Sequence, residues 1–96
     1  MKVVLIVEVE GLQDQAIFEK HLKKEGITPI EGEMFAYEGE TTTHMFSTRT
    51  FILEVVSKGL KKSDFESCKI IFQVGENPME AYRFNLESDS FEQVAV

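Results

Sequence analysis

The stretch that most constrains the fold is FSTRTFILEVV, residues 46–56. β-Branched and aromatic residues dominate it, and Phe51, Leu53 and Val55 recur at every second position. This composition and this spacing are typical of a β-strand with one buried face. The opposite face mixes apolar with polar residues, which predicts a central strand that is covered by helices on one side and only partly covered on the other.

Two further elements flank the start of the chain. Apolar residues occupy both faces of residues 2–9, so we expect a second interior strand there. A helix is expected within residues 12–26, because Asp14 is a suitable N-terminal cap and Gly26 a suitable C-terminal stop. Residues 27–37 predict a weaker strand, which Pro29 restricts to a sheet edge or a bulge.

The polar segment EGETTTH, residues 38–44, is expected to be the tip of a hairpin that leads into the central strand. After that strand, a short second helix is expected within residues 60–69. Alternating apolar residues predict strands at residues 69–74 and 81–86.

The order of these elements predicts a fold class. Strand, helix, strand, strand, helix and strand form the ferredoxin-like βαββαβ plan, an α+β sandwich with an antiparallel sheet, both helices on one face and here an extra short C-terminal strand. We expect a single domain over residues 1–86. Residues 87–96 are expected to form a flexible acidic tail.

Composition excludes several classes of partner. The net charge of −7 argues against nucleic acid and anionic membranes, which attract clustered Lys and Arg. The apolar N-terminal stretch is too short to span a membrane. Cys68 is the only cysteine, so it cannot form an internal disulfide, and we expect an inert buried thiol in a cytoplasmic protein.

The residues around the expected hairpin suggest a ligand site. Hydroxyl groups, an imidazole and a guanidinium are concentrated between positions 41 and 49, and such groups can hold a phosphate or a carboxylate. The alternative is an ordinary polar hairpin. The candidate ligand-binding residues for a small anionic ligand are Thr41, Thr42, Thr43, His44, Thr48 and Arg49.

The helix-free sheet face suggests self-association. Val4, Ile6, Phe46 and Ile52 are expected to form an exposed apolar patch on it. Exposed patches of this kind mark interfaces, and twofold pairing is the commonest oligomer symmetry. We therefore expect a homodimer that is closed through this face.

Two acidic residues carry the alternative reading as an enzyme. If Glu8 and Glu54 were neighbours on the central strands, they could hold a divalent cation, as in a metal-dependent phosphodiesterase. The other reading is a solvated sheet face. His21 and His44 are far apart in sequence, which argues against zinc, and we expect no cofactor.

The chain carries no motif that is specific to one family, but two resemblances are visible. The order of elements resembles the ACT-type and PII-type regulatory domains, and residues 38–48 correspond to the long effector loop of the PII type. The run LKKEGITPIEGEMFAYEGE is similar to the CRISPR-associated small nucleases and their toxin relatives. That family has a metal-binding aspartate at the end of its first strand, where this chain has Glu8 and Glu10.

Together these observations predict a small binding or regulatory module without enzymatic activity. The alternatives are a metal-dependent nuclease of the same topology and an adaptor whose partner adds a strand along the edge formed by residues 27–37.

Overall fold

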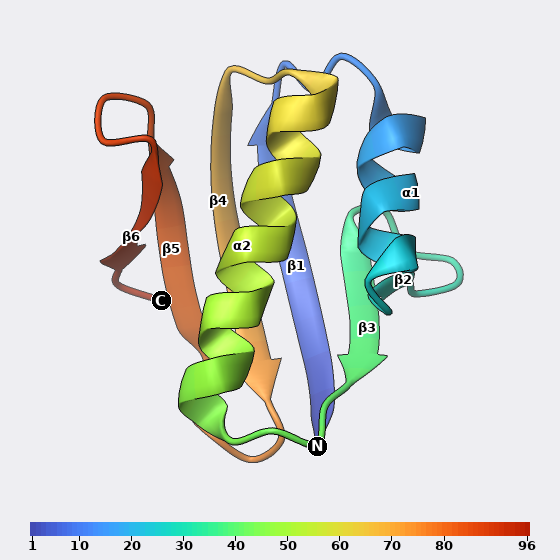
Figure 1. Cartoon of the computed structure of the whole chain (residues 1–96), viewed down its shortest axis with the longest axis vertical. Helices are drawn as coiled ribbons and strands as arrows, with labels where there is room; N and C mark the ends of the chain where they lie inside the picture. The colour runs from blue at the N-terminus through green and yellow to red at the C-terminus, as the bar shows by residue number, and fades with distance from the viewer.

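A computed structural model describes all residues 1–96, and it contains two helices and one six-stranded sheet (Figure 1). Neither helix combines the length and the apolar character that crossing a membrane would require. The elements, in chain order, are β1 (Lys2–Glu10), α1 (Gln15–Lys24), β2 (Thr28–Pro29), β3 (Ala36–Glu40), α2 (Met45–Ser63), β4 (Ser67–Val74), β5 (Glu80–Asn85) and β6 (Ser90–Val94).

The sheet is antiparallel throughout, in the order β2-β3-β1-β4-β5-β6. Both helices lie on the same side of it, with α2 across β1 and β4 and α1 over β3 (Figure 1). The predicted α+β class with an antiparallel sheet is confirmed. The order differs from that of a four-stranded ferredoxin-like sheet, because β5 and β6 extend the sheet beyond β4.

The core lies between the helices and the sheet, and the alternation along β1 and β4 creates it. The two strands pair over eight positions, from Val3 opposite Val74 to Glu10 opposite Ser67. Residues that face the helices are buried, whereas their neighbours in sequence are half-buried or exposed. Burial raises the pKa of the Cys68 thiol to about 12, which keeps this β4 side chain protonated and inert, as expected.

The prediction of a central strand at residues 46–56 is wrong, because this stretch lies inside helix α2. The buried positions of α2 follow a helical period and not a period of two. Three of these buried positions hold small or polar residues, which a search for an apolar stripe in the sequence leaves out. The buried residues are Thr48, Ile52, Val55, Val56, Gly59, Leu60 and Ser63.

Other boundaries shift as a consequence. The expected hairpin tip at residues 38–44 instead joins β3 to α2, and the expected helix at 60–69 is the end of α2 followed by the start of β4. The observed hairpin connects β2 to β3 through residues 30–35. Part of the expected tail, residues 90–94, pairs with β5 as strand β6.

Helix α1 agrees with its prediction in detail. The carboxylate of Asp14 accepts a hydrogen bond from the amide of Ile17 at 3.1 Å, which caps the helix start. Beyond the helix end, Gly26 has a φ of +89°, a conformation that glycine adopts without strain.

The contact between α1 and α2 is close because Gly59 of α2 has no side chain. A Cβ atom at this position would lie 3.1 Å from side-chain carbons of Phe18 and Leu22. His21 is buried at the same side of α1, and neither of its ring nitrogens has a hydrogen-bond partner. Its pKa is lowered by burial and by the nearby lysine charges, with Lys62 of α2 the largest among them.

This burial predicts a pH-dependent stability. Because the folded-state pKa of His21 lies below its unfolded value near 6.5, the unfolded chain binds more protons as the pH falls. The free energy of unfolding, measured with urea, should therefore decrease from pH 7.5 to pH 5.5. The variant His21→Leu removes an unpaired imidazole, whose burial costs about 1–3 kcal/mol. The decrease in the free energy of unfolding between pH 7.5 and pH 5.5 should be much smaller in this variant.

His44→Leu is the matched control, because His44 is exposed and precedes α2. This variant should keep the pH dependence of the wild type. Equal slopes in the wild type and in His21→Leu would show that other groups cause the effect.

Candidate functional site

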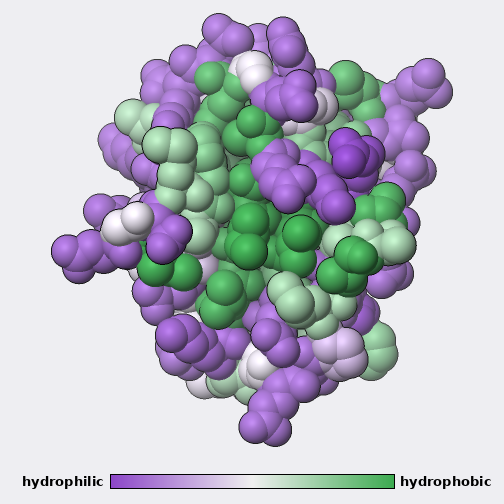
Figure 2. Space-filling view, turned by 180° about the vertical axis from the view of Figure 1, so that it is seen from behind, coloured by the Kyte–Doolittle hydropathy of each residue, from purple (hydrophilic) through white to green (hydrophobic).

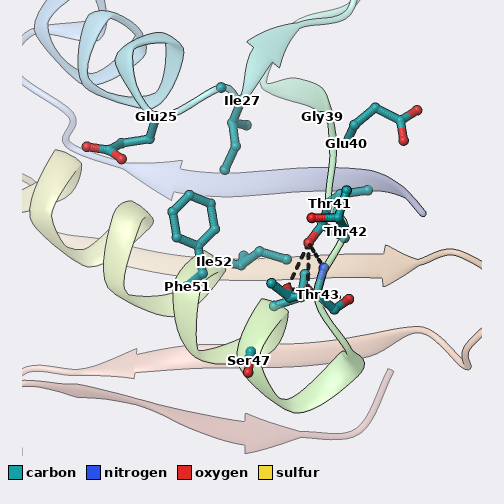
Figure 3. Close-up of a pocket in the computed structure, with 13 residues that line it drawn as sticks. Glu25, Ile27, Gly39, Glu40, Thr41, Thr42, Thr43, Ser47, Phe51 and Ile52 are labelled. Carbon is teal, nitrogen blue, oxygen red and sulfur yellow. Dashed lines mark hydrogen bonds between the residues drawn. The ribbon is translucent and has the colours of Figure 1, made fainter.

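The candidate site is a cavity of about 320 Å³ beside the first half of α2 (Figure 3). Three segments surround it: the start of β1 with the end of β3, the connection from α1 to β2, and the segment that leads into α2. Its lining residues are Val3, Glu25, Gly26, Ile27, Gly39, Glu40, Thr41, Thr42, Thr43, Ser47, Thr48, Phe51 and Ile52. Its volume lies at the lower end of the range for small-molecule sites.

Three threonine hydroxyls form a closed triangle on one side of the cavity. The Oγ1 atoms of Thr41, Thr43 and Thr48 lie 2.8–3.0 Å from one another. The backbone amide of Thr43 also donates to Thr41 Oγ1 at 3.2 Å, which fixes the turn before α2. Each hydroxyl can donate once and accept twice, so the triangle keeps unused acceptor capacity toward an occupant.

The opposite side of the cavity is apolar. Ile27, Phe51 and Ile52 extend toward its middle in Figure 3. The backbones of two glycines meet beside them, since a Cβ atom on Gly39 would lie 2.9 Å from the carbonyl oxygen of Gly26. A larger residue at position 39 would push β3 away from the end of α1 and change the cavity wall.

The charges that line the cavity are all negative. Glu25 and Glu40 are its only charged residues, and no Lys, Arg or His side chain lines it. Their carboxylates lie at opposite ends of the site and point outward (Figure 3), and Glu40 Oε2 lies 3.8 Å from the N-terminal ammonium of Met1. Glu25 would attract an approaching cation and repel an anion, whereas the charge of Glu40 is offset by the ammonium beside it.

Arg49, the predicted anion-binding residue, is used elsewhere. Its Nε and one terminal nitrogen donate to the two carboxylate oxygens of Glu80 on β5, at 2.7 and 2.8 Å. The Tyr82 hydroxyl donates to the same carboxylate at 2.7 Å. The hydrogen bonds from Arg49 hold the pKa of Glu80 below its usual range despite burial. This cluster ties the first turns of α2 to β5.

His44 stands at the N-terminal cap position of α2 but does not line the cavity. Its Nε2 lies 3.3 Å from the hydroxyl oxygen of Ser47, which does line it. A hydroxyl beside an imidazole is the start of a nucleophile–base pair. No carboxylate orients this imidazole, however, and both side chains are exposed. The structure thus brings Thr41, Thr42, Thr43 and Thr48 together, and it leaves His44 and Arg49 outside the cavity.

The predicted interface residues are divided between two sides of the molecule. Val4 and Ile6 lie on the helix-free face of β1, as expected. Phe46 and Ile52 belong to α2, which covers the other face. Ile52 is 1% exposed and part of the core, whereas Phe46 is 69% exposed at the start of the helix. These four residues therefore do not form the apolar patch that was expected on the helix-free face.

The predicted metal residues are also separated. Glu8 is on the helix-free face of β1, opposite Lys69 of β4 in the strand register. Glu54 is on the solvent side of α2 and forms an ion pair with Lys58 at 2.8 Å. The sheet lies between the two carboxylates, and no group of three potential metal ligands occurs in the structure.

Nine of the thirteen lining residues lie outside the set predicted from the sequence, and Glu25, Glu40, Gly39 and Phe51 are among them. The sequence analysis places Gly39 in an expected hairpin tip and Phe51 in an expected strand, and no pattern singles out Glu25 or Glu40. One signal was present: TTTH before a long stretch with helical spacing is a typical helix start, and it would have moved residues 45–56 into a helix.

Comparisons with known proteins do not add a family. A scan against protein-family models, a search of curated proteins and a search of solved structures each found no match.

The ion pair between Arg49 and Glu80 leads to a prediction about stability. Arg49→Met would leave the Glu80 carboxylate, 11% exposed, with Tyr82 as its only partner. We expect a loss of about 2–3 kcal/mol in the free energy of unfolding, measured with urea at pH 7.

The matched control is Lys58→Met, which removes an exposed ion pair from the same helix. It should cost less than about 1 kcal/mol. The double variant Arg49→Met, Glu80→Gln should recover part of the loss, because it no longer buries an unpaired charge. Equal small losses in Arg49→Met and Lys58→Met would show that the Arg49 cluster does not stabilise the fold.

Proposed function

We propose that this protein is a small binding module without enzymatic activity, and that its ligand occupies the cavity beside α2. The observation that carries this proposal is the lining of the cavity, which combines an apolar wall, a triangle of hydroxyls and two carboxylates at its ends. Sites for small molecules combine an apolar wall with polar groups that fix the orientation of the ligand. Here four of the thirteen lining residues are hydrophobic, so polar side chains supply much of the lining.

The lining also indicates the class of ligand. Phe51 and Ile52 favour an apolar body, and the hydroxyls of Thr43 and Thr48 favour a hydrogen-bonding group. Glu25 favours a positive over a negative group, and Glu40 contributes less because it is paired with the N-terminal ammonium. The sequence suggested an anionic ligand because of Arg49, but that guanidinium is engaged by Glu80. We therefore favour a small neutral or cationic organic molecule.

Binding is favoured over catalysis because the cavity lacks activated groups. Hydroxyls are weak nucleophiles unless a positioned base removes the proton. The only candidate base is His44, and nothing orients its ring toward Ser47 in the manner of a catalytic triad. Glu8 and Glu54, the residues of the nuclease alternative, lie on opposite sides of the sheet.

We also propose a ferredoxin-like core within the larger sheet. Its support is the order β2-β3-β1-β4, in which β3 lies between β1 and β2 and the helices follow β1 and β3. In this reading β5 and β6 are an added hairpin. The relation to regulatory domains remains an analogy of topology, because residues 38–48 form the end of β3 and the start of α2 and not a long loop.

The adaptor alternative has weaker support. β2 is at the sheet edge, where residues 27–37 were expected to place a strand. It contains only two residues, and one of them is Pro29, which has no amide hydrogen to donate. A partner strand would therefore find few hydrogen bonds along this edge.

A matched series of probes tests the cavity. Phenethylamine, 2-phenylethanol and 3-phenylpropionate share a phenyl ring and a two-carbon arm, and they end in a cation, a neutral hydroxyl and an anion. In two-dimensional NMR titrations, the amine and the alcohol should shift the amide signals of residues 41–43 and 48 in a saturable manner. The amine should bind about tenfold more tightly than the carboxylate at low salt.

Two phenylalanines of α2 provide a matched pair of variants. Phe51→Ala removes an aromatic ring from the cavity wall, whereas Phe46→Ala removes one that does not line the cavity. Binding of phenethylamine should weaken in Phe51→Ala and persist in Phe46→Ala. The absence of saturable shifts with all three probes, or equal binding by both variants, would contradict the proposal.

A further inference from the structure

The helix-free sheet face carries an unbroken apolar row across five strands. The strand registers place Ile6 of β1 between Ala36 of β3 and Ile71 of β4, and they continue the row through Ala81 of β5 to Val94 of β6. Figure 2 shows this face, with apolar side chains gathered across its middle and polar ones around them. Ile6 is 39% exposed although it is at the centre of the sheet, whereas Ala81 of the same row is 0% exposed.

A charged row runs beside the apolar row. In the same registers, Glu8 of β1 is next to Lys69 of β4, followed by Arg83 of β5 and Glu92 of β6. The signs along the row are therefore negative, positive, positive, negative. None of the four takes part in the ion pairs of the chain, although Glu92 accepts a hydrogen bond from Asn85 at 3.0 Å.

The apolar row and the charged row complement the same two rows of a second copy when the two faces pair in a suitable orientation. One possible twofold axis lies in the plane between the two copies, parallel to the strands and midway between β1 and β4. It places Ile6 opposite Ile71 of the second copy, and it places Glu8 opposite Lys69 of the second copy, each contact occurring twice. An axis between β4 and β5 would instead oppose Lys69 with Arg83, two like charges. Of these two axes, charge complementarity favours the first.

The area of the face suits such a pairing. The two longer extents of the molecule are 32 and 28 Å, which multiply to about 900 Å². Each partner in a standard interface buries about 800 Å², so nearly the whole face would be used. Two sheets that pack face to face lie about 10 Å apart, a distance that side chains such as Ile6 and Ile71 can fill.

We propose that the helix-free face binds a second copy of this chain, as a twofold dimer whose axis runs between β1 and β4. Ile6 and Ile71 form its apolar centre, and Glu8 and Lys69 form two ion pairs between the copies. The cavity is on the other side of the sheet, so the dimer contacts do not involve the hydroxyls or the apolar wall of the cavity. The success or failure of the dimer proposal therefore leaves the binding proposal untouched.

Charge reversal provides the test. Glu8→Lys places lysines opposite each other in the dimer, and Lys69→Glu places glutamates opposite each other. Each variant alone should be more than about tenfold weaker in self-association than the wild type, measured by sedimentation and native mass spectrometry. One reversal makes the net charge of −7 less negative and the other makes it more negative, so net charge cannot explain a loss in both.

Mixing the two variants separates contacts between chains from contacts within one chain. In a mixed dimer, positions 8 and 69 are both lysine in one copy and both glutamate in the other. Every contact between the copies then joins opposite charges again, although each chain keeps its own like-charged neighbours. We expect mixed dimers at the abundance of the wild type, resolved by ¹⁵N labelling of one variant. Glu33→Lys, an exposed reversal in the β2–β3 hairpin, should leave dimerisation unchanged.

Three results would overturn the proposal. The first is a monomeric wild type at millimolar concentration, and the second is a dimer that both single reversals leave intact. The third is a mixture of the two variants that stays monomeric while each remains folded by circular dichroism. If Gln93→Pro abolishes the dimer but the reversals do not, the copies pair through the edge of β6 and not through this face.

Discussion

The alternation of side chains along the paired strands β1 and β4 is the constraint on which the remaining structure depends. Each strand sends every second residue toward the helices, and the register aligns these residues into a buried surface. Because the period is two, a slip of one position would reverse both faces at once. The same register therefore determines the core, the side covered by α2 and the composition of the helix-free face.

Much of the fold could be predicted from these strands and from α1, whose cap at Asp14 and stop at Gly26 are local signals. Hydrophobic periodicity alone does not predict helix α2, because its buried stripe includes Thr48, Gly59 and Ser63, which a count of apolar residues omits. β-Branched residues near position 52 favoured a strand locally. Packing against the sheet outweighed that preference, since helical stability in proteins comes chiefly from tertiary contacts.

The candidate site was predicted in part. The hydroxyls at positions 41–43 and 48 do gather at one place, because a turn followed by a helix brings residues that are several positions apart into contact. The role given to Arg49 could not have been corrected from the sequence. Its partner Glu80 is 31 positions away, and no local pattern connects a helix residue with a carboxylate on a distant strand.

The ion pair between Arg49 and Glu80 connects helix α2, on one side of the sheet, to strand β5, which also contributes to the helix-free face. Glu80 and Ala81 are consecutive residues of β5, so their side chains point to opposite faces of the sheet. A shift of α2 that moved Arg49 would displace the same backbone that carries Ala81. Thermodynamic coupling between two binding events is reciprocal. A molecule that moved α2 on entering the cavity would change the affinity of the two copies for each other, and dimerisation would change the affinity for that molecule by the same factor.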